Sequence, residues 1–201
     1  MDDDTELYRR WSTGDSVAGH ELVRRNLDSL LRFLRSKVGA DASDLAHETL
    51  TRCITARDRF RGDSKFRTFM LSVATNVLRE YIRKRIKNSR ADFQDVTAER
   101  LDPTPSEVLS NKQDIKLLLF ALRKLPIDQQ LILELAYWEN LTSKEIGVIL
   151  ERPPGTIRRQ LGEARASLER TMAQLPTPND LRTSMVMRLV PGRTLGPEES
   201  S

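Results

Sequence analysis

The fold is decided by residues 44–87, which read DLAHETLTRCITARDRF, then RGDSKF, then RTFMLSVATNVLREYIRKRIK. In the first and third parts, apolar residues recur every three or four positions, which is the period of an amphipathic helix. Gly62 lies between the two parts. Asp63 or Ser64 can cap the helix that follows, because a short side-chain oxygen accepts bonds from the free amides of the first turn. The stretch therefore predicts two helices joined by a short turn.

Each of these two helices is predicted to bury one side. The first helix begins near residues 41–44 and runs to about Asp58, and its inward side consists of Leu45, Ala46, Thr49, Leu50, Cys53 and Ile54. Its outward side consists of Asp44, His47, Glu48, Thr51 and Arg52. The inward side of the second helix consists of Phe66, Phe69, Met70, Val73, Ala74, Val77, Tyr81 and Ile82. The second helix continues beyond these apolar positions into turns of mostly Arg and Lys.

The charge of the chain is concentrated at the end of that second helix. The formal net charge is only +4, so bulk charge alone does not indicate a nucleic-acid partner. Between Arg79 and Arg90, however, six basic residues stand against one acidic residue, Glu80. A local field of that kind attracts phosphates. We expect the run to contact nucleic acid, with a solvated helix face as the competing interpretation.

Upstream of this stretch the pattern is also helical. A short amphipathic segment at residues 1–13 ends at Gly14, and Asp15 or Ser16 can cap a helix that runs to about Val38. Gly39 closes this helix, as a residue free to adopt positive φ would. The predicted inward positions are Val23, Leu27, Leu30, Leu31, Leu34 and Val38.

Downstream, the periodicity fails from about residue 88 to 111 and then returns. Asp102-Pro-Thr-Pro105 cannot continue a helix, because proline lacks an amide donor and restricts the residue before it. Helical patterns resume at Asp114 and persist to about Leu175. Their predicted inward residues include Ile127, Leu131, Ile132, Leu135, Ala136 and Trp138, and then Ile146, Val148, Ile149 and Leu150.

The predicted fold class is therefore all-α, with two small helical domains joined by a flexible linker. The predicted boundaries are 1–90 for the first domain, 91–111 for the linker, 112–172 for the second domain and 173–201 for a tail. The tail contains Leu181, Met185 and Leu189 at a spacing that would give a short helix one apolar face. We expect this tail to be regulatory or disordered.

The second domain has the layout of a helix-turn-helix. Residues 142–150 predict a short helix capped by Thr142 or Ser143, Arg152-Pro-Pro-Gly155 predicts a tight turn, and Thr156 starts the next helix. In such motifs the N-terminal side chains of the second helix enter the major groove. Arg158, Arg159 and Gln160 occupy those positions, and Arg and Gln can pair bidentately with guanine and adenine. An ordinary helical hairpin with a charged surface is the competing interpretation.

The first domain offers a different kind of nucleic-acid contact. Phe60, Phe66 and Phe69 flank the turn beside the basic helix, and aromatic rings next to cations suit unstacked bases. Core packing is the competing interpretation, and we expect Phe66 and at least one other ring to be buried. Asn76, Arg79 and Arg83 lie three and four residues apart, on one side of their helix. Asn76 can read a base edge, and the two arginines can hold phosphates.

Several other classes of protein are disfavoured. Cys53 is the only cysteine, so neither an intramolecular disulfide nor a thiolate metal site is possible, and we expect it to be buried. His47-Glu48 is followed by Thr51-Arg52 where a zinc-protease motif has its second histidine, so we predict no metal and no cofactor. No segment has the order of a signal peptide, and no apolar run approaches the ~20 residues that span a bilayer. We expect a cytoplasmic protein that is not an enzyme.

The order of these parts resembles a known family, the sigma-70 class of bacterial RNA polymerase sigma factors, and within it the short extracytoplasmic-function (ECF) type. The resemblance covers about residues 5–172 and rests on several motifs in one order. They are Asp44-Leu-Ala-His-Glu-Thr-Leu50, Asp58-Arg-Phe-Arg-Gly-Asp63, Phe66-Arg-Thr-Phe69, Ala74-Thr-Asn76, Leu125-Pro126, Lys144-Glu-Ile146, and Pro154-Gly-Thr156-Ile157 through Ala164-Arg165.

The resemblance implies partners and sites. The first domain would be region 2, which docks on the clamp helices of the largest polymerase subunit through Asp44, Leu45, His47, Glu48 and Thr49. It would melt the promoter −10 element and capture a flipped base through Phe60, Arg61, Gly62, Asp63, Lys65, Arg67, Phe69, Asn76, Arg79 and Arg83. The second domain would be region 4, which reads the −35 element through Thr142, Pro154, Thr156, Arg158, Arg159, Gln160 and Arg165. The polymerase β flap and an anti-sigma factor are further implied partners.

The chain departs from the family pattern at three places. Phe69 stands where the family usually has Trp, and His47 where it usually has Gln. Gly162-Glu163 replaces the usual His-Arg, which removes positive charge from the second turn of the recognition helix. We therefore expect an unusual −35 sequence, or one contacted mainly through the first turn. Two other classes stay open: a stand-alone helix-turn-helix regulator, and a sigma mimic that titrates an anti-sigma factor.

Overall fold

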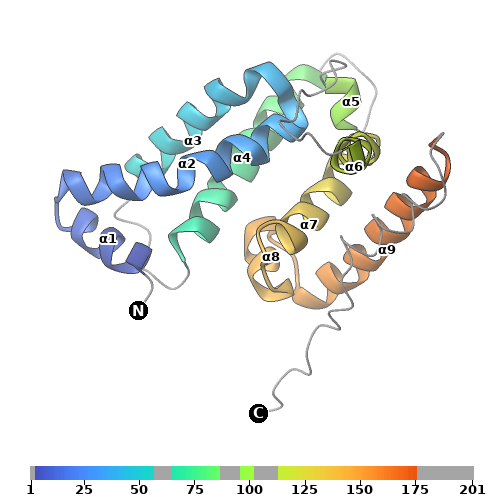
Figure 1. The fold of residues 1–201 in the computed structure, drawn as a ribbon. Helices are drawn as coiled ribbons and strands as arrows, with labels where there is room; N and C mark the ends of the chain where they lie inside the picture. The colour runs from blue at the N-terminus through green and yellow to red at the C-terminus, as the bar shows by residue number, and fades with distance from the viewer. Residues whose placement is uncertain (1–2, 57–64, 87–95, 102–112, 176–201) are drawn as a thin grey trace, which may run out of the picture.

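The computed structural model describes residues 3–56, 65–86, 96–101 and 113–175, and every regular element among them is helical (Figure 1). The sequence prediction of an all-α fold with two small helical modules is confirmed. The elements are α1 (Asp3–Ser12), α2 (Ser16–Val38), η1 (Gly39–Asp41), α3 (Ala42–Thr55), α4 (Phe66–Ile86), α5 (Ala98–Leu101), α6 (Gln113–Arg123), α7 (Ile127–Tyr137), α8 (Ser143–Leu150) and α9 (Pro154–Ala173).

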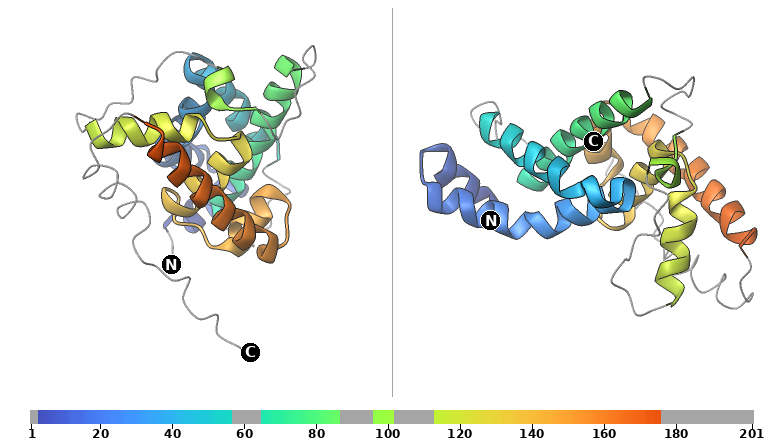
Figure 2. Two further views of the ribbon diagram at one scale, coloured as in Figure 1. Left: turned by 90° about the vertical axis from the view of Figure 1, so that its right-hand side faces the viewer. Right: turned by 90° about the horizontal axis from the view of Figure 1, so that it is seen from above.

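Helices α1 to α4 form the first module, in which α2 runs beside the other three (Figures 1 and 2). The buried side chains of α2 include Leu22, Leu30, Phe33 and Leu34. This face is rotated from the predicted one, since Val23, Leu27 and Leu31 are only partly buried. The reason is that the buried face of α2 also includes the polar residues Asn26, Ser29 and Lys37, which a pattern of apolar residues does not mark.

The ends of α2 follow from short-range chemistry. The Asp15 carboxylate accepts bonds from the backbone amides of Val17 and Ala18 at 3.0 and 3.1 Å, as predicted for an N-cap. Gly39, at φ 54°, ends the helix. Gly19 permits a close helix crossing, because a Cβ at this position would lie 2.4 Å from the indole ring of Trp11.

Part of the predicted linker belongs to the core. Val96, Ala98 and Leu101 are buried, and the Val96 carbonyl accepts a bond of 2.8 Å from the backbone amide of Ile127. The linker is predicted because the helical periodicity of apolar residues stops there. That periodicity identifies only regular helices, so it gives no sign that an irregular segment packs into the core. The short helix expected to begin at Ser106 lies outside the described residues.

Helices α6 to α9 form the second module, and α8 and α9 have the helix-turn-helix layout. Of the two predicted caps, Thr142 and Ser143, Thr142 caps α8, and it forms a capping box with Glu145. Helix α9 begins at Pro154, two residues before the predicted start at Thr156. Proline is well suited to the first turn, where its fixed φ is helical and its missing amide has no intrahelical partner.

The two modules pack against each other through α4 and α8, and through α2 and α6 (Figure 2). Three residues expected to face inward are instead substantially exposed: Ile54 at 54%, Trp138 at 44% and Val148 at 60%. Each stands at the border of its apolar stripe, where a helical period alone does not decide the side. The prediction that Cys53 is buried is confirmed.

Candidate nucleic-acid and polymerase interface

The outward side of α3 presents the acidic surface that the sequence predicts. Asp44, His47 and Glu48 are exposed on successive turns. Leu45 and Thr49, which belong to the same predicted site, are buried, and the Thr49 hydroxyl donates to the Leu45 carbonyl at 2.7 Å. These two side chains therefore support the helix from inside, and only the exposed trio can meet a partner directly.

Arg52 joins this acidic surface to the basic helix. Its guanidinium donates to both carboxylate oxygens of Glu80 on α4, at 2.7 and 2.6 Å, and to Glu48 on its own helix at 2.7 Å. The bond from Arg52 lowers the pKa of the Glu80 carboxyl. This bidentate geometry fixes the register of α3 against α4. It also neutralises the one acid within the basic run, so the end of α4 stays net positive.

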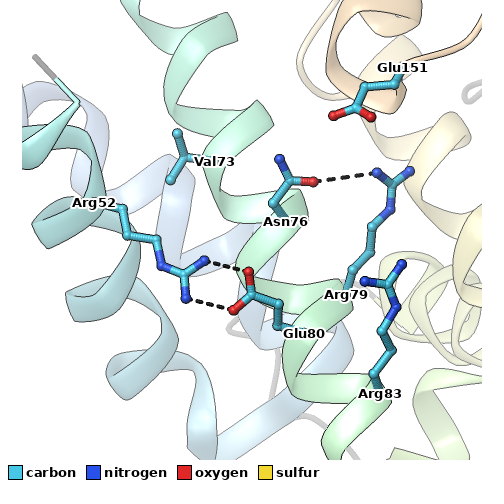
Figure 3. A pocket seen from close by; sticks show the side chains of 7 residues that line it. All are labelled: Arg52, Val73, Asn76, Arg79, Glu80, Arg83 and Glu151. Carbon is cyan, nitrogen blue, oxygen red and sulfur yellow. Dashed lines mark hydrogen bonds and ion pairs between the residues drawn. The ribbon is translucent and has the colours of Figure 1, made fainter. Parts of the chain in front are cut away.

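Asn76, Arg79 and Arg83 lie on one side of α4, as their spacing predicts, and line a pocket of about 390 Å³ (Figure 3). Arg52, Val73, Glu80 and Glu151 complete its walls. Glu151 comes from the second module, immediately after α8. Basic and amide groups meet here at a concave surface, which suits a nucleotide with its phosphate.

The Arg79 side chain already forms hydrogen bonds within this pocket. Its guanidinium donates to the Leu150 carbonyl at 3.4 Å and to the Asn76 side-chain oxygen at 3.5 Å. Burial lowers the pKa of the guanidinium from its usual range, although it remains charged. Arg79 therefore stabilises the C-terminal end of α8, where the helix dipole is negative.

Two of the phenylalanines near the turn, Phe66 and Phe69, belong to the described residues, and both pack at the core. Phe66 is 2% exposed and packs against the rings of Tyr8 and Trp11, with centroids 6.3 and 6.2 Å away. Phe69 is partly buried against Phe66. The expectation that Phe66 is buried is confirmed. The remaining predicted contacts of the turn, Phe60, Arg61, Gly62 and Asp63, lie outside the described residues.

Arg67 does not point at a free surface. Its guanidinium forms an ion pair with Glu139 and donates to the Ser29 hydroxyl at 2.8 Å. Glu139 follows α7 in the second module, and the Ser29 hydroxyl also donates to it at 3.1 Å. Arg67 therefore connects the two modules. The side chain of Lys65, two residues earlier, is exposed.

The recognition helix α9 presents part of the predicted set. Pro154, Arg158 and Arg159 are exposed, while Thr156, Gln160 and Arg165 are partly buried. Gln160 accepts a bond of 3.1 Å from Arg152, and Arg159 pairs with Glu163 one turn later. The Arg165 guanidinium lies over the Tyr137 ring at 5.2 Å. Pro154, Arg158 and Arg159 are thus the predicted residues best placed to reach a groove.

A buried polar cluster between the modules has no counterpart in the sequence predictions. The Lys37 side chain is fully buried and pairs with Glu134 of α7, while Gln130 donates to that carboxylate at 2.8 Å. Arg123 donates to the Ser36 carbonyl at 3.1 Å. Burial lowers the pKa of the Lys37 ammonium, and the Glu134 carboxylate opposes that shift. The sign of this cluster in the sequence is that Lys37 stands among the apolar residues of α2.

Comparison with family models gives two matches. Residues 22–88 match the model of sigma-70 region 2, and residues 115–168 match the model of sigma-70 region 4. Together these spans cover more than half of the chain. The chain belongs to the sigma-70 family. As predicted from its motifs, it is a sigma factor of the ECF type, a class that directs promoter-specific transcription.

This sigma factor is similar to named relatives along most of its length. It is 24% identical over 182 residues to the ECF RNA polymerase sigma-E factor of Escherichia coli K12, covering 86% of this chain and 95% of the relative. It is 25% identical over 190 residues to the RNA polymerase sigma-H factor of Pseudomonas aeruginosa, covering 87% and 96%.

Two solved structures share the fold of this sigma factor. The structure of CnrH in complex with the cytosolic domain of CnrY has a TM-score of 0.63 at 20% identity, with 86% of this chain and 98% of that chain covered. The structure of the sigma factor RpoE in complex with the anti-sigma factor NepR from Bartonella quintana has a TM-score of 0.62 at 21% identity, with 77% and 96% covered. Within its described residues, no helix is long and apolar enough to cross a membrane.

Proposed function

We propose that this sigma factor binds core RNA polymerase through the exposed side of α3 and engages the promoter through α4 and α9. The acidic trio Asp44, His47 and Glu48 would dock on the clamp helices of the largest subunit. The single observation that supports this most is the contact of α3 with the basic end of α4, where Arg52 pairs with Glu80 and Asp41, at the start of α3, pairs with Arg85. A polymerase contact and a DNA contact would then be adjacent on one rigid pair of helices.

The promoter contacts divide between the two modules. Asn76 and Arg83, with the turn before α4, would hold the melted −10 strand, because an amide can read a base edge and a guanidinium can hold a phosphate. Arg158 and Arg159 at the start of α9 would read the −35 element in the major groove. Since Gly162 and Glu163 follow, this reading is concentrated in the first turn of α9.

The protein would act by binding and not by catalysis, in the cytoplasm where RNA polymerase works. The domain boundaries 1–90, 91–111, 112–172 and 173–201 are part of the same proposal. An anti-sigma factor is a proposed regulatory partner, and the similar complex of RpoE with the anti-sigma factor NepR supports it by its fold. The polymerase β flap is the proposed partner of the second module.

Reversing the charge of the α3 surface tests the polymerase contact. The variant Asp44→Arg/Glu48→Arg is expected to weaken binding to core polymerase more than tenfold, because like charges replace an electrostatic complement across the interface. Affinity is measured by fluorescence anisotropy of labelled sigma factor.

The control variant for this test is Asp28→Arg/Glu169→Arg, which makes the same change of net charge at two exposed residues outside the proposed interface. It is expected to bind core polymerase like the wild type. Equal binding by the α3 variant and the control would refute the proposed docking surface. Circular dichroism of both variants shows whether the helices are retained.

A further inference from the structure

Helix α9 buries one side and exposes the other. Its buried side chains, spaced three and four residues apart, include Ile157, Leu161, Ala164 and Leu168. Arg159 and Glu163 are exposed on the other side, four residues apart. Because the buried side packs against α7 and α8, the side that carries Arg159 and Glu163 is the one that a DNA groove would meet.

Arg159 and Glu163 form an ion pair on this exposed side. The Arg159 Nη1 donates to the Glu163 Oε1 at 2.5 Å, and the two side chains are 64% and 54% exposed. The neighbouring Gly162 and Ala166 are exposed as well, and a Cβ at Gly162 would meet nothing within 4 Å. The two charged side chains therefore project beyond the short side chains beside them.

Neither helix stability nor attraction to the DNA backbone accounts for Glu163. An exposed ion pair between residues four apart stabilises a helix only slightly, because water screens it. Toward DNA, the carboxylate repels phosphates and neutralises a cation that would otherwise attract them. A carboxylate on the side of α9 that meets DNA is therefore unfavourable, unless it accepts a hydrogen bond from a base.

The major groove offers such hydrogen-bond donors only at certain bases. Cytosine presents its N4 amino group there, and the guanine paired with it presents two acceptors, O6 and N7. Thymine presents an acceptor and a methyl group, and adenine presents an acceptor beside its amino group. A carboxylate, which can only accept, therefore suits cytosine best.

The ion pair as a unit matches both edges of one G·C base pair. The bond to Glu163 uses Nη1 of Arg159, so Nε and Nη2 remain as two parallel donors for guanine O6 and N7. Glu163 uses Oε1 for that bond, so Oε2 remains to accept from the cytosine amino group. Donors beside an acceptor on the protein thus face acceptors beside a donor on the DNA.

We propose that Arg159 and Glu163 together determine base specificity by reading one G·C base pair of the −35 element, with Arg159 at the guanine and Glu163 at the cytosine. The inference rests on the proposed reading of the −35 element by α9, and it adds one contact from the second turn of that helix. Glu163 acts by exclusion, because it weakens binding to every duplex and weakens it least where a cytosine amino group is present.

Selection of promoters by the holoenzyme tests this inference. Core polymerase with the full-length sigma factor is incubated with a duplex DNA library of random sequence, and the bound molecules are sequenced. The upstream elements recovered with the wild type are expected to share an invariant G·C base pair. With Glu163→Ala, the preference for G·C over A·T at that position is expected to fall about tenfold.

The affinity for other DNA distinguishes base reading from a structural role. Glu163→Ala is expected to raise the affinity of the holoenzyme for duplexes without the element, since a repulsive carboxylate is gone. A loss of helix structure would instead lower the affinity for all duplexes. Fluorescence anisotropy with labelled duplexes measures both affinities, and thermal unfolding verifies that the variant is folded. Glu169→Ala, the same change at another exposed residue of α9, is expected to keep wild-type base preferences.

Three results would overturn the inference alone: a wild-type element without an invariant G·C pair, an unchanged preference in Glu163→Ala, or an equal loss of affinity for all duplexes in that variant. Arg158→Ala separates these results from a failure of the proposed function. If α9 reads the −35 element, this variant weakens binding to the recovered element whatever Glu163 does. Recovery of no common upstream element, or of one that Arg158→Ala binds as well as the wild type, would refute the reading by α9 and the inference with it.

Discussion

Arg79 has two candidate partners, the carbonyl end of α8 and a DNA phosphate, and it cannot hold both at once. In the present arrangement it donates to the Leu150 carbonyl at 3.4 Å, which is a long bond for a guanidinium. A phosphate would offer two strong acceptor oxygens in the geometry that arginine matches best. A DNA phosphate would therefore be the stronger of the two acceptors for Arg79.

Cys53 gives a direct test of the first module at the scale of one residue. Burial raises the pKa of its thiol to about 12, so the nucleophilic thiolate is scarce below that pH. At pH 8.5 the native protein is expected to react with a disulfide reagent at least 100-fold more slowly than the urea-unfolded chain, whose thiol has an ordinary pKa. Absorbance of the released thiolate follows the reaction. Native labelling as fast as unfolded labelling would contradict the burial of Cys53.

Single residues also show where sequence reasoning succeeds and where it fails. Phe66 and Cys53 are buried as predicted, because each stands on the apolar side of its helix among other apolar positions. Leu71 and Leu78 of α4 are fully buried but lie off the predicted stripe. Helix α4 is covered by helices from both modules, so it buries residues on more than one side. A rule that assumes one buried face per helix cannot find them.

Helix α8 is stabilised by Thr142, its N-cap residue, and this role is separate from the predicted contact of Thr142 with DNA. Its hydroxyl accepts a bond from the Glu145 amide, and the Glu145 carboxylate accepts from the Thr142 amide at 2.8 Å. Thr142→Ala is expected to lower the free energy of unfolding by about 1 kcal/mol, and Thr142→Ser to preserve it. Urea denaturation measures both. Equal stability of the alanine variant and the wild type would show that the capping box contributes nothing.

Replacing two glycines of the helix-turn-helix with alanine is expected to change the free energy of unfolding in opposite directions. A Cβ at Gly147 would lie 2.6 Å from the Arg152 carbonyl, whereas one at Gly162 would meet nothing within 4 Å. Gly147→Ala is expected to lower the free energy of unfolding by about 1–3 kcal/mol, because the backbone carbonyl cannot move aside cheaply. Gly162→Ala is expected to raise it by about 0.5–1 kcal/mol, because alanine favours a helix interior.

Thermal or urea unfolding of these two glycine variants provides the measurement, and each variant is the control for the other. A stabilising Gly147→Ala would contradict the close approach of the turn to α8. The two glycines also show which features of the motif can be predicted from the sequence and which cannot. The helix, the turn and the cap are local and were predicted, but the close contact at Gly147 depends on how the chain returns after Glu151, whose φ is 57°.

At the scale of the whole molecule, the two modules are predictable and their contact is not. Each module follows from periodicity, caps and turns within about one hundred residues of sequence. The contact joins Lys37 to Glu134 and Arg67 to Glu139, which are 97 and 72 residues apart. Nothing local in the sequence pairs such residues. A lone lysine in an apolar stripe normally indicates an end of the stripe, and its burial depends on a partner from elsewhere.

We expect this sigma factor to direct core RNA polymerase to particular promoters. The most direct test is transcription in vitro with purified core polymerase and genomic DNA, followed by sequencing of the RNA 5′ ends with and without the protein. New start sites are expected that share paired −10 and −35 sequences and that disappear with Asp44→Arg/Glu48→Arg. Start sites identical to those of core polymerase alone would contradict this function.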